Sequence, residues 1–413
     1  MIDLGLEKIN PDDDMKRVIK EVFDGLGDEK SRYLKSIRKN QKMLNRFISP
    51  GNRINENTPS FISILRKWNS YTPVLPANMG HSKGGGYFIY HAGVGIVIDP
   101  GFNFIQNFFR QGFKIDDIDV IIITHAHNDH TAELESILSL YFKRNKNVKK
   151  KEKKKIDIYL NVGAFKKYSS FFDLSTPDKP DYIGNIVPLD SYNEYLVPKN
   201  DNSDGNSDIS IITNKTQHHE MITATYALGF ILRIGDKYIR FTGDTGWDSD
   251  VETQNNKYFE EKQIEKIDIL IPHIGSIEKT EFQFDFTKTI KENKGNFYKN
   301  HLGILGCICL AYQIKPEMII LSEFGEELRD IRIDIVRKIH DILRIPSLPG
   351  DIGLHIKIDD LTVFCCRNGN FVSLDKIKPY KIHDDIYYSS DGPFKEYDNN
   401  FPKKLFDIIE RKK

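Results

Sequence analysis

The segment Val120-Ile121-Ile122-Ile123-Thr124-His125-Ala126-His127-Asn128-Asp129-His130 decides the fold of this chain. It opens with an apolar run that predicts a buried strand. Three imidazoles and one carboxylate follow within six residues, at His125, His127, His130 and Asp129. Side chains gathered at a strand end can converge on one point, and imidazole with carboxylate suits zinc and its first-row neighbours. The segment therefore predicts a metal site; a histidine-rich surface loop is the alternative interpretation.

The composition sets limits on class and partners. With 413 residues the chain can bury a large core, and its 59 basic and 59 acidic side chains balance, so net charge predicts neither nucleic acid nor membrane as a partner. The four cysteines include no C-x-x-C pair, which favours reduced thiols. The first residues lack the pattern of a signal peptide, and no apolar run approaches the ~20 residues of a membrane span. We therefore expect a cytoplasmic protein that does not enter the membrane.

Residues 1–70 carry apolar side chains at helical spacing among many charged ones. Val18 and Val22 begin one stripe, and Leu34 and Ile37 begin another. The pattern predicts two or three helices, with breaks at Gly27-Asp28 and at Ser49-Pro50-Gly51. We expect a helical N-terminal extension that packs on the main domain or on a second subunit, which makes a homodimer a candidate assembly. A cap over the substrate is the alternative.

From residue 71 the pattern changes to strands and helices in alternation. Strands are expected at 87–90 and 95–98, and helices at 102–112 and 131–142. Alternation of this kind indicates layered α/β packing. We expect one domain over residues 71–375 and a C-terminal tail over residues 376–413 that packs on it.

Further candidate ligands follow the first motif in order. A two-metal centre needs ligands on both flanks and a bridging anion, because two ions of like charge repel each other. Most of the candidates adjoin an apolar strand-like run or a glycine turn, and they are the pair His218-His219, Asp244 in a Gly-Asp-Thr turn, His273, His301 and Glu323. The sequence therefore supplies candidate ligands for a two-metal site.

From about residue 72 to 370 this order resembles the metallo-β-lactamase superfamily of metal-dependent hydrolases, and most nearly its ribonuclease Z and phosphodiesterase branch. The resemblance implies a four-layer αββα sandwich of the α/β (α+β) class, with the site at one edge of two mixed sheets. It implies that a first metal binds His125, His127 and a histidine of the 218–219 pair, that a second binds Asp129 and His130, and that Asp244 bridges both. We favour His218 as the ligand and His219 as its support, because neighbouring residues of a strand face opposite sides.

Three further residues take their expected roles from the same resemblance. Asp99 would orient the first-motif loop by hydrogen bonds, or else cap the turn before Pro100-Gly101. His273 would support the pocket, or merely follow a strand that Pro272 ends. The usual last ligand is a histidine, and this chain has Glu323 there. A carboxylate can also bind zinc, manganese or iron, so we expect Glu323 to be a ligand.

The reaction implied is metal-assisted hydrolysis of a phosphodiester in a nucleotide or RNA. Two divalent transition-metal ions, zinc or alternatively manganese or iron, would yield a bridging hydroxide at neutral pH. Asp129 would orient that nucleophile as well as bind metal. His301 precedes an apolar helical stretch and would protonate the leaving group or bind the phosphate; a helix-terminal histidine without a catalytic role is the alternative.

Other functions fit the same residues. A hydrolase of this fold could act on a small-molecule ester, lactone or amide. A binding protein with a degenerate metal site is a second alternative, because Glu323 departs from the usual ligand. A di-iron oxidoreductase with a flavin-binding partner is a third, because carboxylate-rich ligation suits iron.

Overall fold

The structure is a computed structural model of the whole chain. It describes residues 11–27, 29–51, 53–69, 84–146, 148–172, 180–198, 208–219, 226–328, 331–361, 363–365, 370–372, 378–382 and 385–389. The chain divides into two compact units, Met1–Ser49 and Pro50–Lys413. Among the described residues, none of the helices is both long and apolar enough to cross a membrane.

The first unit consists of two helices where the sequence predicts them. They are α1 (Pro11–Gly25) and α2 (Glu29–Ile48). Gly27, with φ +36°, separates them, and α2 ends just before Ser49-Pro50-Gly51. Apolar side chains of both stripes are exposed, at Val18 and Val22 on α1 and at Ile37 on α2, whereas Phe47 near the end of α2 is buried. The packing partner predicted for these stripes, including a second subunit, stays a prediction.

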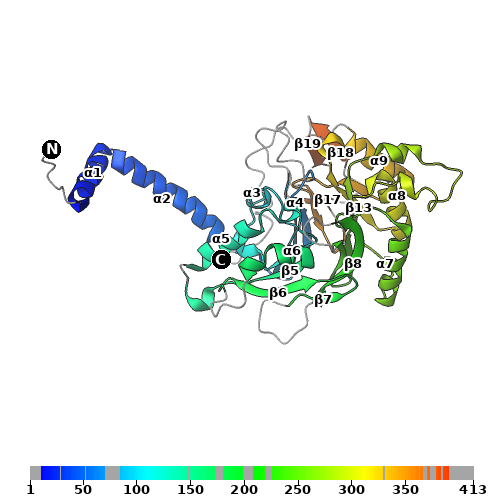
Figure 1. Ribbon diagram of the computed structural model, residues 1–413, viewed down its shortest axis with the longest axis horizontal. Coiled ribbons are helices and arrows are strands. Elements are labelled where there is room, and N and C mark those ends of the chain that lie inside the picture. The colour runs from blue at the N-terminus through cyan, green and yellow to red at the C-terminus, as the bar shows by residue number, and fades with distance from the viewer. Residues whose placement is uncertain are drawn as a thin grey trace, which may run out of the picture. The chain divides into compact units, whose positions relative to one another are not determined.

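The second unit contains two mixed sheets (Figure 1). The first sheet has nine strands in the order β17-β16-β15-β1-β2-β3-β4-β5-β6. Its strands are β1 (Phe61–Ile64), β2 (Tyr87–His91), β3 (Val94–Ile98), β4 (Val120–Ile123), β5 (Ile156–Asn161), β6 (Ile183–Leu189), β15 (His355–Lys357), β16 (Val363–Cys365) and β17 (Asn370–Val372). Strands β3 to β6 run parallel and the other pairs are antiparallel.

The second sheet follows the order β12-β13-β11-β10-β9-β8-β7, with β14 paired to β13. Its strands are β7 (Glu194–Leu196), β8 (Ile209–His219), β9 (Tyr226–Ile234), β10 (Lys237–Phe241), β11 (Ile269–Ile271), β12 (His273–Gly275), β13 (Met318–Phe324) and β14 (Ser347–Pro349). The half around β13 is parallel and the half around β8 is antiparallel. A separate hairpin joins β18 (Lys378–Ile382) to β19 (Asp385–Ser389).

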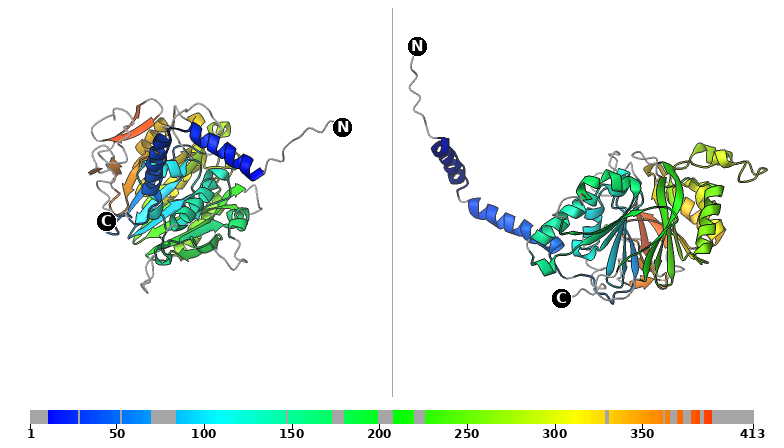
Figure 2. Two further views of the ribbon diagram at one scale, coloured as in Figure 1. Left: turned by 90° about the vertical axis from the view of Figure 1, so that its left-hand side faces the viewer. Right: turned by 60° about the horizontal axis from the view of Figure 1, so that its bottom comes forward.

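Helices cover the outer faces of both sheets, which gives the αββα sandwich predicted from the sequence. In the right-hand view of Figure 2, α5 and α6 lie on one side and α7 to α9 on the other. The helices of this unit are α3 (Phe104–Arg110), α4 (Asn128–Thr131), α5 (Leu134–Lys146), α6 (Val162–Lys167), α7 (Ser249–Glu261), α8 (Gly303–Ile314) and α9 (Arg332–Leu343). Short 3-10 helices lie at Ile115–Asp117, Lys150–Glu152, Ser169–Phe172, Lys279–Gln283, Lys294–Asn296 and Glu326–Leu328.

The main core lies between the two sheets. Strand β13 shows how period-two alternation builds it, because successive side chains of a strand face opposite sides. Ile320 packs into the cluster between the sheets. Its neighbours Ile319 and Leu321 belong to the cluster that includes Leu310 of α8 and Val336 of α9. A strand covered on both faces reads as a continuous apolar run, as Met318 to Leu321 does.

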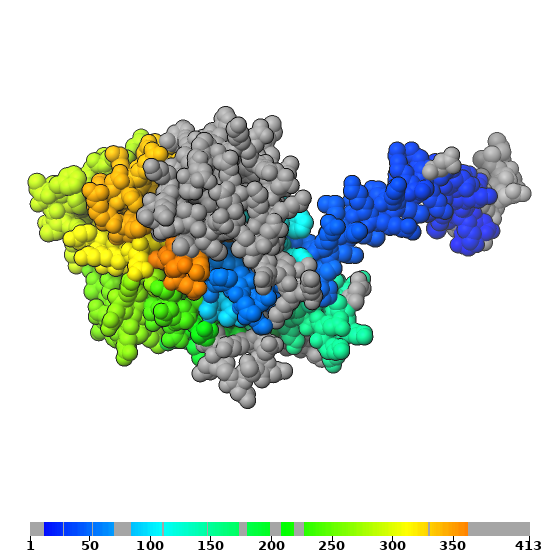
Figure 3. Space-filling model, turned by 180° about the vertical axis from the view of Figure 1, so that it is seen from behind, coloured from blue at the N-terminus to red at the C-terminus, as the bar shows by residue number. Residues whose placement is uncertain are grey.

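Two elements differ from the sequence-based expectation. Strand β1 lies inside the range 1–70 that we assigned to the helical extension, and it pairs with β2 and β15. A four-residue apolar run carries too little periodicity to be recognised as a strand. Because all four residues of β1 are buried, the blue surface that Figure 3 shows beside the orange one belongs to neighbouring parts of the chain. The helix expected at 131–142 is split into α4 and α5, so that Asp129 and His130 lie in a helical turn.

Candidate metal centre

The first motif stands where strand β4 ends. His125 and His127 lie in the connection after Ile123, and α4 then begins at Asn128. This tight strand–loop–helix passage turns all four candidate side chains toward the neighbouring second sheet. His125 and His130 are fully buried, and Asp129 is almost so. Buried imidazoles need partners for both ring nitrogens, and these partners define the centre.

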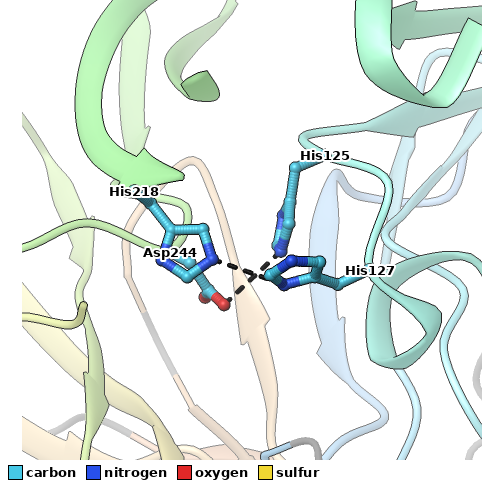
Figure 4. Close-up of side chains that lie close together, drawn as sticks. All are labelled: His125, His127, His218 and Asp244. Carbon is cyan, nitrogen blue, oxygen red and sulfur yellow. Dashed lines mark hydrogen bonds and ion pairs between the residues drawn. The ribbon is translucent and has the colours of Figure 1, made fainter. Parts of the chain in front are cut away.

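A first group of side chains joins the motif to the second sheet. Nitrogen or oxygen atoms of His125, His127, His218 and Asp244 all lie within 4.8 Å of one another (Figure 4). His218 lies on β8, and Asp244 follows β10. Nε2 of His125 lies 3.6 Å from Oδ2 of Asp244. Of the pair at 218–219, His218 has its ring in this group, while the side chain of His219 lies outside the described part.

A second group shares one of these carboxylates. Asp129, His130, Asp244 and Glu323 bring one atom each within 4.8 Å of one another. Nε2 of His130 lies 3.2 Å from Oδ2 of Asp129, 3.4 Å from Oδ2 of Asp244 and 3.8 Å from Oε2 of Glu323. Oδ2 of Asp244 therefore faces an imidazole of each group. This is the arrangement expected of a bridging ligand.

The two groups fit the requirements of bound cations. Nε2 of His125, His127 and His130 is buried and makes no hydrogen bond, although buried polar atoms normally find a partner. Two donors that bind one tetrahedral zinc at roughly 2.0–2.1 Å lie about 3.4 Å apart. The separations of 3.2–3.8 Å around His130 match that value. The residues present can therefore hold two metal ions, one in each group.

Charges in the centre favour the same conclusion. Burial, reinforced by the neighbouring imidazoles, lowers the pKa of His125 well below its usual value, which keeps the ring neutral and its lone pair free. Burial opposes ionisation of Asp244, but the imidazoles of His301 and His130 outweigh it and hold the pKa of Asp244 well below its usual range. Asp244 is thus an anion and His125 a neutral ring, and these are the states that metal ligands require.

Asp99 fixes the orientation of the motif, in the place where the sequence predicted its support. It is fully buried, and its Oδ1 accepts the backbone N–H of Thr124 at 2.8 Å. Its Oδ2 accepts the Thr124 hydroxyl at 2.7 Å and Nδ1–H of His130 at 2.9 Å. A proton on Nδ1 leaves Nε2 of His130 as the lone-pair nitrogen. His218 is oriented likewise, because its Nδ1 lies 2.9 Å from the backbone oxygen of Asn300.

His273 lies behind the two shared carboxylates. Its Nδ1 is 3.0 Å from Oδ1 of Asp244 and 3.3 Å from Oε1 of Glu323. Its Nε2 lies 3.1 Å from the hydroxyl of Tyr87, which in turn lies 2.8 Å from the hydroxyl of Ser322. The chain of contacts sets the tautomer, with Nδ1–H donating to Asp244 and Tyr87 donating to Nε2. Tyr87 and Ser322 were not singled out from the sequence.

His301 borders the first group. Its Nδ1 lies 3.7 Å from Oδ1 of Asp244, and its ring centroid lies 5.6 Å from that of His218. The side chain keeps 15% of its surface exposed, whereas His125 and His130 are fully buried. Gly275, with φ +63°, makes room for it, since a Cβ there would overlap the ring. Burial lowers the pKa of His301, with Asp244 opposing the shift.

The αββα sandwich and the paired groups at one edge of its sheets define the class of this domain. Residues 86–283 match the family model of the metallo-beta-lactamase superfamily, and the chain carries a domain of that superfamily. The matched range includes Asp99, the first motif and Asp244. His301 and Glu323 lie outside it.

Several solved structures resemble the chain. The metallo-beta-lactamase fold protein YhfI from Bacillus subtilis is 12% identical, with a TM-score of 0.50 over 72% of this chain and 99% of that one. The short form of human tRNase Z is 16% identical, with a TM-score of 0.46 over 72% and 99%. A diphosphatase of the PhnP family is 14% identical, with a TM-score of 0.47 over 73% and 98%. The likeness to YhfI supports the fold, and no curated protein matches the chain.

Proposed function

We propose that this protein is a metal-dependent hydrolase with a dinuclear centre, and that its substrate is a phosphodiester. One observation carries the proposal: Asp244 belongs to both candidate groups, with Oδ2 at 3.6 Å from Nε2 of His125 and 3.4 Å from Nε2 of His130. A carboxylate so placed can hold two cations side by side. A two-metal site suits in-line displacement at phosphorus, because it stabilises both the attacking and the leaving oxygen.

The protein's side chains divide between the two cations. His125, His127 and His218 hold the first, and Asp129, His130 and Glu323 hold the second, with Asp244 in common. When bound, the cations supply a water of lowered pKa and positive charge toward the substrate. Asp129 would accept a hydrogen bond from that water as well as bind metal.

The charge balance favours an anionic substrate. Two divalent cations carry four positive charges, and Asp129, Asp244 and Glu323 supply three negative ones. Before a bound water loses its proton, the centre would therefore carry a net charge of +1, which would attract a phosphodiester anion, and the cations would stabilise the further charge of its transition state. A neutral ester or lactone gains only the second of these effects. His301, partly buried at the border of the centre, is placed to donate a hydrogen bond to a phosphate or leaving-group oxygen.

The test compares two chromogenic substrates on protein loaded with zinc, manganese or iron. Cleavage of bis(p-nitrophenyl) phosphate should exceed cleavage of p-nitrophenyl acetate, and Asp244→Ala should abolish it together with metal binding. His301→Ala should reduce phosphodiester cleavage by about 100-fold, the usual contribution of a proton-transfer group, while metal content stays unchanged. The exposed His340 of α9 is the control, and His340→Ala should match the unaltered protein.

Two other results of this comparison would contradict the proposed phosphodiesterase activity. Faster turnover of the acetate would favour an ester hydrolase of the same fold. A loaded protein that cleaves neither substrate would favour a binding protein.

A further inference from the structure

A buried arginine stands behind the second group of candidate ligands. Arg66 is 1% exposed and Glu323 is 0% exposed, and Nη1 of Arg66 forms an ion pair with Oε1 of Glu323. Charged side chains are almost never buried so completely unless they are paired. The pair is therefore a single electrostatic unit, and one of its members is a candidate metal ligand.

The backbone brings these two residues together across the sandwich. The segment after β1 runs parallel to the end of β13, with a bridge between Trp68 and Phe324. The N–H of Asn69 donates to the backbone oxygen of Phe324 at 3.0 Å. This alignment sets Arg66 against Glu323 on the inner side.

The guanidinium also holds the helical turn that carries the first motif. Nη2 of Arg66 donates to the backbone oxygen of Asp129. Gly101 allows this approach, since a Cβ at that position would overlap the same oxygen and crowd Nη2. Arg66 thus contacts two residues of the second group.

The two oxygens of Glu323 have different surroundings. Oε1 meets Arg66 and lies 3.3 Å from Nδ1 of His273. Neither oxygen makes a hydrogen bond, but Oε2 faces Nε2 of His130 at 3.8 Å and is not the oxygen paired with Arg66. One oxygen thus lies in the ion pair with the guanidinium, and the other faces His130 of the second group.

We infer that Arg66 is a positioning residue for the metal centre, which neutralises Oε1 of Glu323 so that the carboxylate binds the second cation through Oε2 alone. The inference rests on the proposed dinuclear centre. It explains why a carboxylate can stand at this position: Arg66 offsets the negative charge that Glu323 adds. The two residues then depend on each other.

This dependence makes a sharp substitution test. Glu323→His alone supplies a neutral ligand but leaves the buried guanidinium of Arg66 without its anion, next to a cation. The second cation should then bind about 10- to 100-fold more weakly, the usual effect of a disturbed partner of a metal ligand. The double variant R66M/E323H also removes the unpaired guanidinium and should recover most of the affinity for the second cation.

A matched control uses another buried arginine–glutamate pair. Arg240 is 2% exposed and pairs with Glu252 at 2.8 Å, away from the candidate ligands. R240M/E323H therefore loses a buried guanidinium as R66M/E323H does, but it should not regain the second cation. If the histidine variants fail to fold, E323Q and R66M/E323Q give the same comparison with less change in shape.

The measurement is zinc per chain by elemental analysis, with affinities from competition against a chromophoric chelator, and melting temperatures in EDTA. Support requires weak second-site binding in E323H, recovery in R66M/E323H and a higher melting temperature for the double variant. Equal affinities in E323H and the unaltered protein would overturn the inference, as would no recovery in R66M/E323H or recovery in R240M/E323H. If the unaltered protein binds no metal, the proposed function fails with it; if it binds two, only this inference is at stake.

Discussion

Replacing Asp99 by asparagine should weaken the second cation selectively. The carboxylate of Asp99 accepts three hydrogen bonds, two from Thr124 and one from Nδ1–H of His130. An asparagine has the same shape but only one acceptor oxygen. Whichever way its amide is turned, its NH₂ faces an N–H group, either the backbone of Thr124 or the ring of His130.

The size of the effect follows from these contacts. If the NH₂ faces His130, the ring must move its proton to Nε2 to find an acceptor at Nδ1, and the lone pair turned toward Asp244 is lost. Keeping the original tautomer instead leaves a buried donor unsatisfied, at about 1–3 kcal/mol. This free energy corresponds to about 5- to 150-fold weaker binding.

The assay is a zinc titration of metal-free protein against a chromophoric chelator, which resolves two binding steps. Asp99→Asn should weaken the step assigned to His130 and leave the step assigned to His125, His127 and His218 nearly unchanged. Asp119→Asn is a suitable control, because Asp119 is also buried but binds Lys154 and the N–H of Gly95 instead.

The control should lose stability without losing either binding step. Two unchanged steps in Asp99→Asn would refute the argument that Asp99 sets the tautomer of His130. Equal weakening of both steps would show that the substitution distorts the whole loop and acts through the fold instead.

Three further predictions concern stability. Chelation should lower the melting temperature, because a cation that binds only the folded state stabilises it; identical melting curves with and without EDTA would contradict this. Glu281→Ala should lower the free energy of unfolding in urea by about 1–3 kcal/mol, more than Glu281→Gln, because buried Glu281 accepts the N–H groups of Glu278 and Leu305 at 2.9 and 2.8 Å. Asp248→Ala should cost about 1 kcal/mol at pH 7, because Asp248 caps α7. Burial acts to raise the pKa of Asp248, but Lys294 and backbone N–H groups lower it overall. The stabilisation by the ionised cap is therefore present above pH ~4 and disappears as the pH falls through the lowered pKa. An equal loss of unfolding free energy at pH 7 and at pH 3 would contradict this prediction.

The fold was predictable because its signals are local. The apolar run at 120–123 is β4, and the ligands that follow it lie in the next loop and turn, as expected. Asp244 was recognisable from a glycine turn after a strand. Such features depend on neighbours in sequence, so strand periodicity and turn residues reveal them.

The support of the centre was not predictable, because it depends on contacts between distant segments. Tyr87 lies in an apolar strand and reads as a core residue, yet its hydroxyl meets His273, 186 positions away, and Ser322, 235 positions away. Arg66 follows the short strand β1, and both lie in the range 1–70 that the sequence assigned to a helical extension. A single sequence does not show which distant residues are in contact. The side chains that support the candidate ligands were therefore identified only in the structure.

Backbone strain gives a second reason to connect Asp99 and Glu323 with the centre. Both have left-handed backbone angles, with φ +47° for Asp99 and +56° for Glu323, which residues other than glycine rarely adopt. Each such residue costs on the order of 1 kcal/mol and persists only where its surroundings impose it. Asp99 is held by the bonds to Thr124, and Glu323 by the pairing of Ser322 with His273 and of Phe324 with Gly275. A glycine at either position would relieve the strain, but it would remove a carboxylate that touches His130. Two of the chain's left-handed residues therefore lie where acidic side chains turn inward to the same imidazole.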